Sequence, residues 1–149
     1  MPERANEIVQ QQLSRITNPD RQEQYRFISP AVSPYMSVRD SVFNALQQAE
    51  NRRIEPWVST SLALLNHRMR QHESIGFIRG GLNVLKDVQR TGDIFFPTAW
   101  LRSLLGGHVS KDARRELDLF WKKNADYPAM LSSKIRQQSD HLYRLNQNN

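Results

Sequence analysis

The positions of the prolines constrain the fold of this chain most strongly. Pro19, Pro34, Pro56, Pro97 and Pro128 each stand just ahead of a segment in which apolar residues recur every three or four positions. Proline suits the first turn of a helix because its φ is already helical and its missing N–H leaves no hydrogen bond unmade. No proline falls inside one of these apolar periods, so each segment can form a continuous helix.

The periodicity predicts seven or eight helices. They are expected at about 2–16, 19–28, 36–49, 56–66, 72–90, 97–105, 111–124 and 128–145. The run Ile94–Phe96 is the only β-like segment, and Pro97 ends it. Short connections between helices imply antiparallel neighbours. We therefore predict an all-α fold, an irregular α-solenoid of antiparallel helix pairs of the HEAT or armadillo type.

Length and composition fit one globular domain. The chain has 149 residues, of which 38% are hydrophobic and 24% are charged, a balance typical of globular proteins. We expect residues 1–149 to form a single helical domain. Residues 1–18 would supply an N-terminal helix, whose thin apolar stripe of Ile8, Leu13 and Ile16 does not define how it packs.

The charge of the chain is unevenly distributed. The formal net charge is +6. Residues 1–50 hold 5 basic and 6 acidic side chains, net −1, whereas residues 51–149 hold 16 basic and 9 acidic side chains, net +7. Such an excess can attract nucleic acid or an acidic protein surface. Basic and acidic residues are mixed over residues 111–118, however, which is typical of a solvated helix face.

The sequence leaves the cellular compartment open. No apolar run approaches the roughly 20 residues that a membrane span needs. Pro2, Glu3, Arg4 and Glu7 occupy the place of a signal-peptide core. A cytoplasmic protein and a piece cut from a longer, cytoplasmic or periplasmic parent both fit these features.

Motifs for catalysis and metal binding are incomplete or absent. A helical zinc site of the H-E-x-x-H type needs two histidines one turn apart, with a glutamate as the general base. His72 and Glu73 begin such a motif, but Gly76 occupies the place of the second histidine. The chain has no cysteine, no G-x-S-x-G elbow and no phosphate-binding glycine loop. We therefore expect no catalytic residue, no metal ligand and no cofactor in this chain.

Two segments concentrate charged and aromatic residues at helix junctions, namely Glu50–Trp57 and Gln89–Pro97. One interpretation is structural: Asp93 forms a local turn, and Phe95 and Phe96 fill the core. The other interpretation is functional: the segments form a surface that meets another domain or a peptide. The residues alone leave both interpretations open.

The same segments carry a resemblance to a known family. The stretch from Phe27 to about Arg144 resembles the C-terminal helical domain of bacterial M1-family zinc aminopeptidases, the aminopeptidase N relatives. The motifs that carry it are Phe27–Ala31, Val38–Asp40, Glu55–Val58, Gln89–Pro97, Trp100-Leu101, Gly106–His108 and Asp126–Pro128. The string Gln89–Pro97 is the most specific of them.

The resemblance implies a non-catalytic role in a larger metallopeptidase. In that family the zinc, the H-E-x-x-H motif and the Gly-Ala-Met-Glu-Asn exopeptidase motif belong to a separate catalytic domain, so this chain alone is expected to be inactive in proteolysis. Its expected partners are that catalytic domain of the same parent and, in the parent enzyme, a peptide substrate. The helical domain would close and shape the peptide-binding chamber. The candidates for facing the chamber or the catalytic domain are Arg52, Arg53, Trp57, Arg90, Asp93 and Trp100.

A second hypothesis is a free-standing α-solenoid that binds another protein. Nucleic acid is a less favoured ligand, because the basic residues are not interleaved with aromatic ones and no nucleic-acid motif is present. Peptide specificity and oligomeric state are not visible in the sequence.

Overall fold

The computed structural model describes residues 2–147 and forms them into helices and connecting turns, without a β-strand in that range. The all-α prediction is confirmed. The α-helices of this range are α1 (Pro2–Arg15), α2 (Pro19–Ile28), α3 (Met36–Leu46), α4 (Glu55–Leu65), α5 (Ile75–Asn83), α6 (Leu85–Thr91), α7 (Phe96–Leu105), α8 (Lys111–Lys123) and α9 (Ala129–Leu145). Three short 3-10 turns are η1 (Ser29–Val32), η2 (Ala49–Asn51) and η3 (Arg68–Arg70).

The described residues thus contain one helix more than the largest number predicted. The segment predicted as one helix over 72–90 begins only at Ile75 and divides into α5 and α6 at Val84. The backbone of Val84 has φ −93° and ψ 2°, outside the α-helical range. Leu85 and Val88, which follow the break, are both buried. The bend therefore keeps the apolar residues of α6 in the core.

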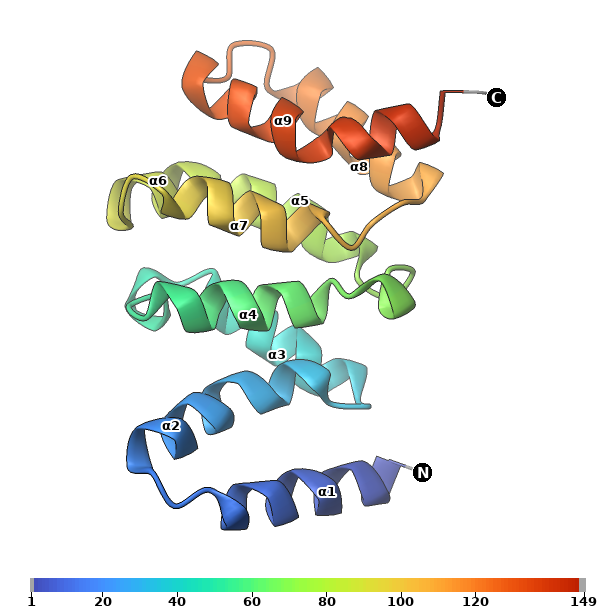
Figure 1. Ribbon diagram of the computed structural model, residues 1–149. Coiled ribbons are helices and arrows are strands. Elements are labelled where there is room, and N and C mark those ends of the chain that lie inside the picture. The colour runs from blue at the N-terminus through green and yellow to red at the C-terminus, as the bar shows by residue number, and fades with distance from the viewer. Residues whose placement is uncertain (1, 148–149) are drawn as a thin grey trace.

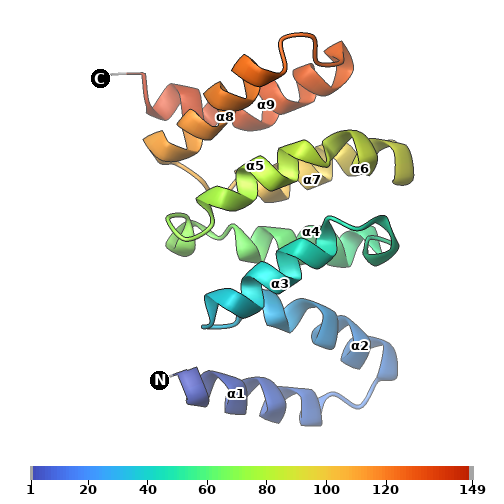
Figure 2. The same cartoon turned by 180° about the vertical axis from the view of Figure 1, so that it is seen from behind.

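The helices stack in layers (Figure 1). The pairs α3 with α4, α5 and α6 with α7, and α8 with α9 form successive layers. The view from behind brings the first helices of these pairs, α3, α5, α6 and α8, to the front (Figure 2). One row of the stack consists of α2, α4, α7 and α9; the other consists of α3, α5 and α8. The closest packing joins α4 to α7, α7 to α9 and α5 to α8. Assignment of this stack to the HEAT or armadillo type stays a prediction.

Local sequence signals explain where helices begin. The Asn18 side chain accepts a hydrogen bond from the Arg21 N–H at 3.1 Å, ahead of Pro19. Ser110 Oγ accepts from the Ala113 N–H at 3.2 Å, at the start of α8. Each contact satisfies one of the backbone donors that a helix leaves unpaired in its first turn.

The core lies between the two rows and centres on Trp100. This side chain is fully buried, and its indole N–H donates to the Gly81 carbonyl at 3.0 Å. A Cβ atom on Gly81 would lie 2.5 Å from Leu104, so a residue without a side chain allows α5 and α7 to approach. Between this layer and the layer of α3 and α4, Phe43 of α3 stacks on Phe77 of α5 with ring centroids 4.4 Å apart.

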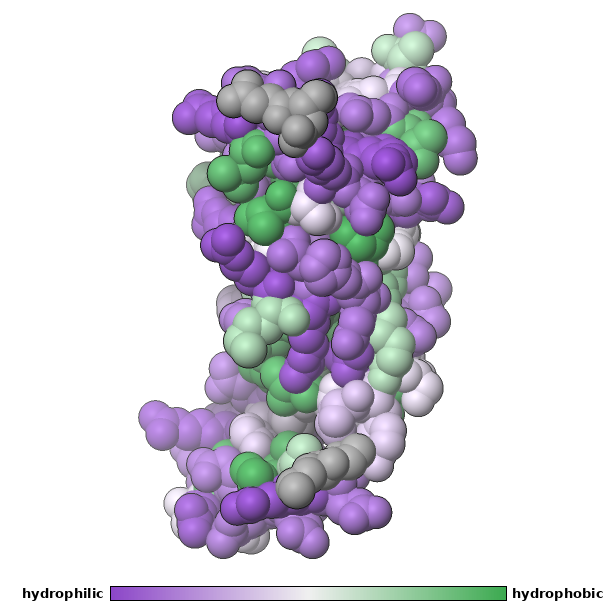
Figure 3. Space-filling model, turned by 90° about the vertical axis from the view of Figure 1, so that its right-hand side faces the viewer, coloured by the Kyte–Doolittle hydropathy of each residue, from purple (hydrophilic) through white to green (hydrophobic). Residues whose placement is uncertain are grey.

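Some residues on the apolar periods of the helices lie at the surface. Val38 and Leu145 are exposed, although each lies on an apolar helical period. Val38 is near the start of α3 and Leu145 ends α9, so no neighbouring helix covers either position. The space-filling view shows a largely hydrophilic surface with hydrophobic patches, some of them at the end of the stack where α1 lies (Figure 3).

A buried histidine connects the turn between α7 and α8 to the end of α4. His108 Nε2 lies 2.8 Å from Asn66 Oδ1, and the Asn66 amide donates to the Leu62 carbonyl at 3.0 Å. This arrangement places the proton of the neutral imidazole on Nε2. Burial, with a smaller contribution from nearby His141, lowers the pKa of His108 from 6.5 to about 4.

Folding stability should therefore fall at mildly acid pH. The His108 pKa is lower in the native chain than in the unfolded one, so the unfolded chain binds a proton first as the pH drops. The stabilisation is complete above about pH 6.5 and decreases toward pH 4, by a total on the order of 3 kcal/mol. Urea unfolding at several pH values measures it. The variant His108→Gln should show a flatter profile in this window; an equally steep profile in the variant would contradict this assignment.

Candidate docking surface

The first of the two junction segments is organised by Arg52, which is buried between layers. One guanidinium nitrogen of Arg52 donates to the carbonyls of Leu46 and Gln47, at 3.1 and 2.8 Å, where α3 ends. The other nitrogen bonds the carboxylate of Asp87 and, at 3.2 Å, the hydroxyl of Thr91, both on α6. The guanidinium also lies 5.9 Å from the centre of the Trp100 ring. Arg52 thus joins two layers of the stack.

Asp87 balances two cations at this junction. Its carboxylate pairs with Arg52 on one oxygen and with Arg90 on the other. Hydrogen bonds from Arg52 and then from Arg90 hold the pKa of the Asp87 carboxyl below its usual value. The acid is therefore ionised at neutral pH, and the buried positive charge of Arg52 is compensated.

The second junction segment contains a turn between α6 and α7 that is held by hydrogen bonds of Asp93, and we call it the clamped turn. Asp93 Oδ1 accepts hydrogen bonds from the N–H groups of Phe95 and Phe96, at 2.7 and 2.9 Å. The Asp93 N–H in turn donates to Glu55 Oε1 of α4 at 2.9 Å. These bonds fix the turn to its own helix and to the neighbouring layer.

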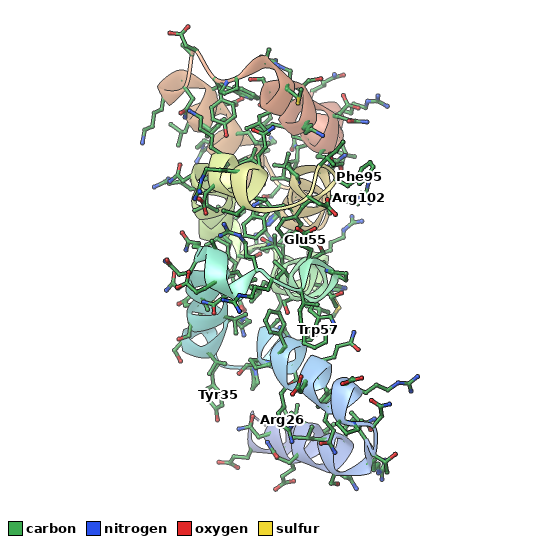
Figure 4. The ribbon with its side chains drawn as sticks, turned by 90° about the vertical axis from the view of Figure 1, so that its left-hand side faces the viewer. Arg26, Tyr35, Glu55, Trp57, Phe95 and Arg102 are labelled. Atoms are coloured by element: carbon green, nitrogen blue, oxygen red, sulfur yellow. The ribbon has the colours of Figure 1, made fainter. Side chains whose placement is uncertain are left out.

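In this turn the side chains of two adjacent phenylalanines point in opposite directions. Phe96 is buried and packs at the edge of the Trp100 ring, with centroids 6.2 Å apart. Phe95 is 74% exposed and Ile94 is 77% exposed. Figure 4 shows Phe95 pointing away from the stack, on the same side as Glu55 and Trp57. We call Ile94 and Phe95 the apolar tip. The expectation that Phe95 fills the core is wrong, whereas Phe96 does fill it.

The six candidate residues do not gather on one accessible face. Arg52 and Trp100 are buried within the chain, and Trp57 is half-buried against Phe27 with ring centroids 5.8 Å apart. The candidates that reach the surface beside the apolar tip or in the turn before α4 are Arg53, Arg90 and Asp93. The structure adds Glu55, Asp87 and the apolar tip to this region. The sequence carried a signal for the turn, because an Asp side chain typically accepts a hydrogen bond from the backbone N–H two residues on. This signal did not show that Phe95 is exposed.

Residues 2–147 bring together no group of three or more His, Asp or Glu side chains that could hold a metal ion. None of the helices in this range combines the length and the apolar character needed to cross a bilayer.

Comparisons of this chain with models of protein families, with curated proteins and with solved structures find no match.

Alanine variants of the neighbouring residues Arg52 and Arg53 test whether Arg52 stabilises the junction. Arg52→Ala removes the partner of two helix-end carbonyls and leaves Asp87 with less compensation, so we expect a loss of about 3 kcal/mol in the free energy of unfolding. Arg53→Ala changes an exposed side chain and should cost less than about 0.5 kcal/mol. Urea denaturation followed by circular dichroism measures both; equal losses would show that Arg52 does not hold the layers.

Proposed function

We propose that this chain is a non-catalytic helical domain of a zinc aminopeptidase, which docks on the catalytic domain and closes the peptide-binding chamber over it. The observation that carries the proposal is the apolar tip. It stands within Gln89–Pro97, the most specific motif of the resemblance to M1-family enzymes, and it is exposed while the residues around it are fixed.

The physical argument rests on how the tip is held. An exposed aromatic side chain on a fixed backbone loses little conformational entropy when it enters a pocket of a partner. Such side chains supply much of the binding energy at protein interfaces. Ile94 and Phe95 expose apolar area that gains from burial, while Asp93 prevents the turn from rearranging.

The charges beside the tip suit a guiding role. Arg53 and Arg90 are exposed, one in each of the two junction segments, and residues 51–149 as a whole carry the net charge of +7. Cations at an interface rim steer an acidic surface, or the carboxylate end of a peptide, toward contact. In this proposal the zinc is held by the catalytic domain, and the described residues of this chain supply shape and charge alone.

Binding to the catalytic segment tests the proposal directly. The tagged chain and the H-E-x-x-H-containing segment of its parent are produced separately, and the affinity between them is measured by titration. Phe95→Asp should weaken binding by about tenfold or more, because it places a charge in a dry contact. Met69→Asp is the matched control, since Met69 is 88% exposed on η3, far along the chain from the tip, and it should leave affinity unchanged.

Two outcomes would contradict the proposed function. One is the absence of any H-E-x-x-H segment in the parent polypeptide. The other is hydrolysis of an aminoacyl-p-nitroanilide by the isolated chain that disappears on adding a chelator, since the chain would then carry the chemistry itself.

A further inference from the structure

The lysines of this chain are used differently from its arginines. The ion pairs within residues 2–147 all join an arginine to a carboxylate. None of the lysines in this range takes part in an ion pair. The ammonium groups are therefore not compensated by the acids of the described chain, and they can bind an anion from outside it.

Three of the five lysines line one recess, at the turn between α8 and α9. Lys122 and Lys123 belong to the last turn of α8, whereas Lys86 comes from the first turn of α6 in the neighbouring layer. The recess has a volume of about 340 Å³, and its other walls are the turn residues 124–127. In Figure 2 this turn lies above the layer of α5 and α6.

Helix electrostatics explain two of the three lysines. The carbonyl groups at the end of a helix stabilise cations in its last turn, which accounts for Lys122 and Lys123. The first turn of a helix favours negative charge instead, so Lys86 has no such explanation. Its ammonium group lies 5.0 Å from the centre of the Tyr127 ring, and this ring packs against Phe120 with centroids 5.0 Å apart. Lys86 is thus positioned at the recess by aromatic residues of the adjacent layer.

The recess also offers backbone donors and holds one acid. The N–H groups of Ala125 and Asp126 donate to no acceptor among the described residues. The Asp126 side chain lines the recess but forms no ion pair with the lysines beside it. Three ammonium groups around one recess repel one another, and a bound anion removes that repulsion.

We propose that this recess binds a phosphate group, with the ammonium groups of Lys86, Lys122 and Lys123 around it. Three ammonium groups and the Asp126 carboxylate give the recess a net charge of +2. A phosphate monoester carries a charge of about −1.5 to −2 at pH 7 and has three acceptor oxygens, so it neutralises the recess. A carboxylate carries a single charge and would leave the recess positive. Lysine binds phosphate as a point charge, which suits this arrangement.

The inference is independent of the proposed peptidase role. The residues of the recess belong to α6, to α8 and to the turn before α9, and none of them is part of the apolar tip. Binding of phosphate and docking on a catalytic domain can therefore be tested, and can fail, separately.

Titration of the whole chain with inorganic phosphate and with glycerol 3-phosphate tests the proposal. Sodium chloride keeps the ionic strength constant, so that general screening does not contribute. The amide NMR signals of Ala125 and Asp126 should shift and saturate in the millimolar range or below. Tighter binding of glycerol 3-phosphate would identify a phosphate carried on a larger molecule as the ligand, and tighter binding of inorganic phosphate would identify the free ion.

Single substitutions locate the site. Lys86→Gln should weaken binding about fivefold or more, because it removes one of three attracting charges. Asp126→Asn should strengthen binding, because it removes the one repelling charge. Lys111→Gln is the matched control, since Lys111 is an exposed lysine at the other end of α8, and it should leave the affinity unchanged. Circular dichroism verifies that each variant is folded.

Three results would overturn the proposal. The first is a set of amide shifts that does not saturate with either probe. The second is an equal loss of affinity in Lys86→Gln and Lys111→Gln, which would indicate attraction by the net charge of the chain. The third is weaker binding in Asp126→Asn.

Discussion

A buried guanidinium connects the middle layers of this molecule, and the geometry of the exposed turn depends on it. Arg52 satisfies two carbonyls at the end of α3, which have no partner within their own helix. Burying a charge is costly unless it is paired with an opposite charge and hydrogen-bonded; here both terminal nitrogens of Arg52 are bonded, whereas its Nε has no partner in the chain. Asp87 supplies the pair and Thr91 a further acceptor, both from α6. The same helix leads directly into the clamped turn, so the position of Phe95 follows from a contact in the interior.

The sequence was sufficient for the helices and for most of their boundaries. Asn18, Ser110 and the prolines mark helix starts by local chemistry, which acts whatever the rest of the chain does. The break at Val84 was not predictable in this way. It follows from packing α6 on its neighbours, and a periodicity of 3.6 residues continues across the bend without a visible interruption.

The junction was only partly predictable, for a different reason. Arginine is rarely buried without a partner, and the partner of Arg52 lies 35 positions further along the chain. No local pattern reports such a pair. Phe95 and Phe96 differ by one helical position, about 100°. Phe96 shares a face with Trp100, one turn later, so the period of α7 already indicated which ring turns inward.

The central claim is that Arg52 fixes the turn that carries Phe95, and amide hydrogen exchange tests it most directly. In the native chain the N–H groups of Phe95 and Phe96 donate to Asp93 and should exchange slowly. In Arg52→Ala they should exchange about tenfold faster or more, while amides around Leu142 in α9 keep their native rates. Unchanged exchange at Phe95 and Phe96 in the variant would contradict the claim.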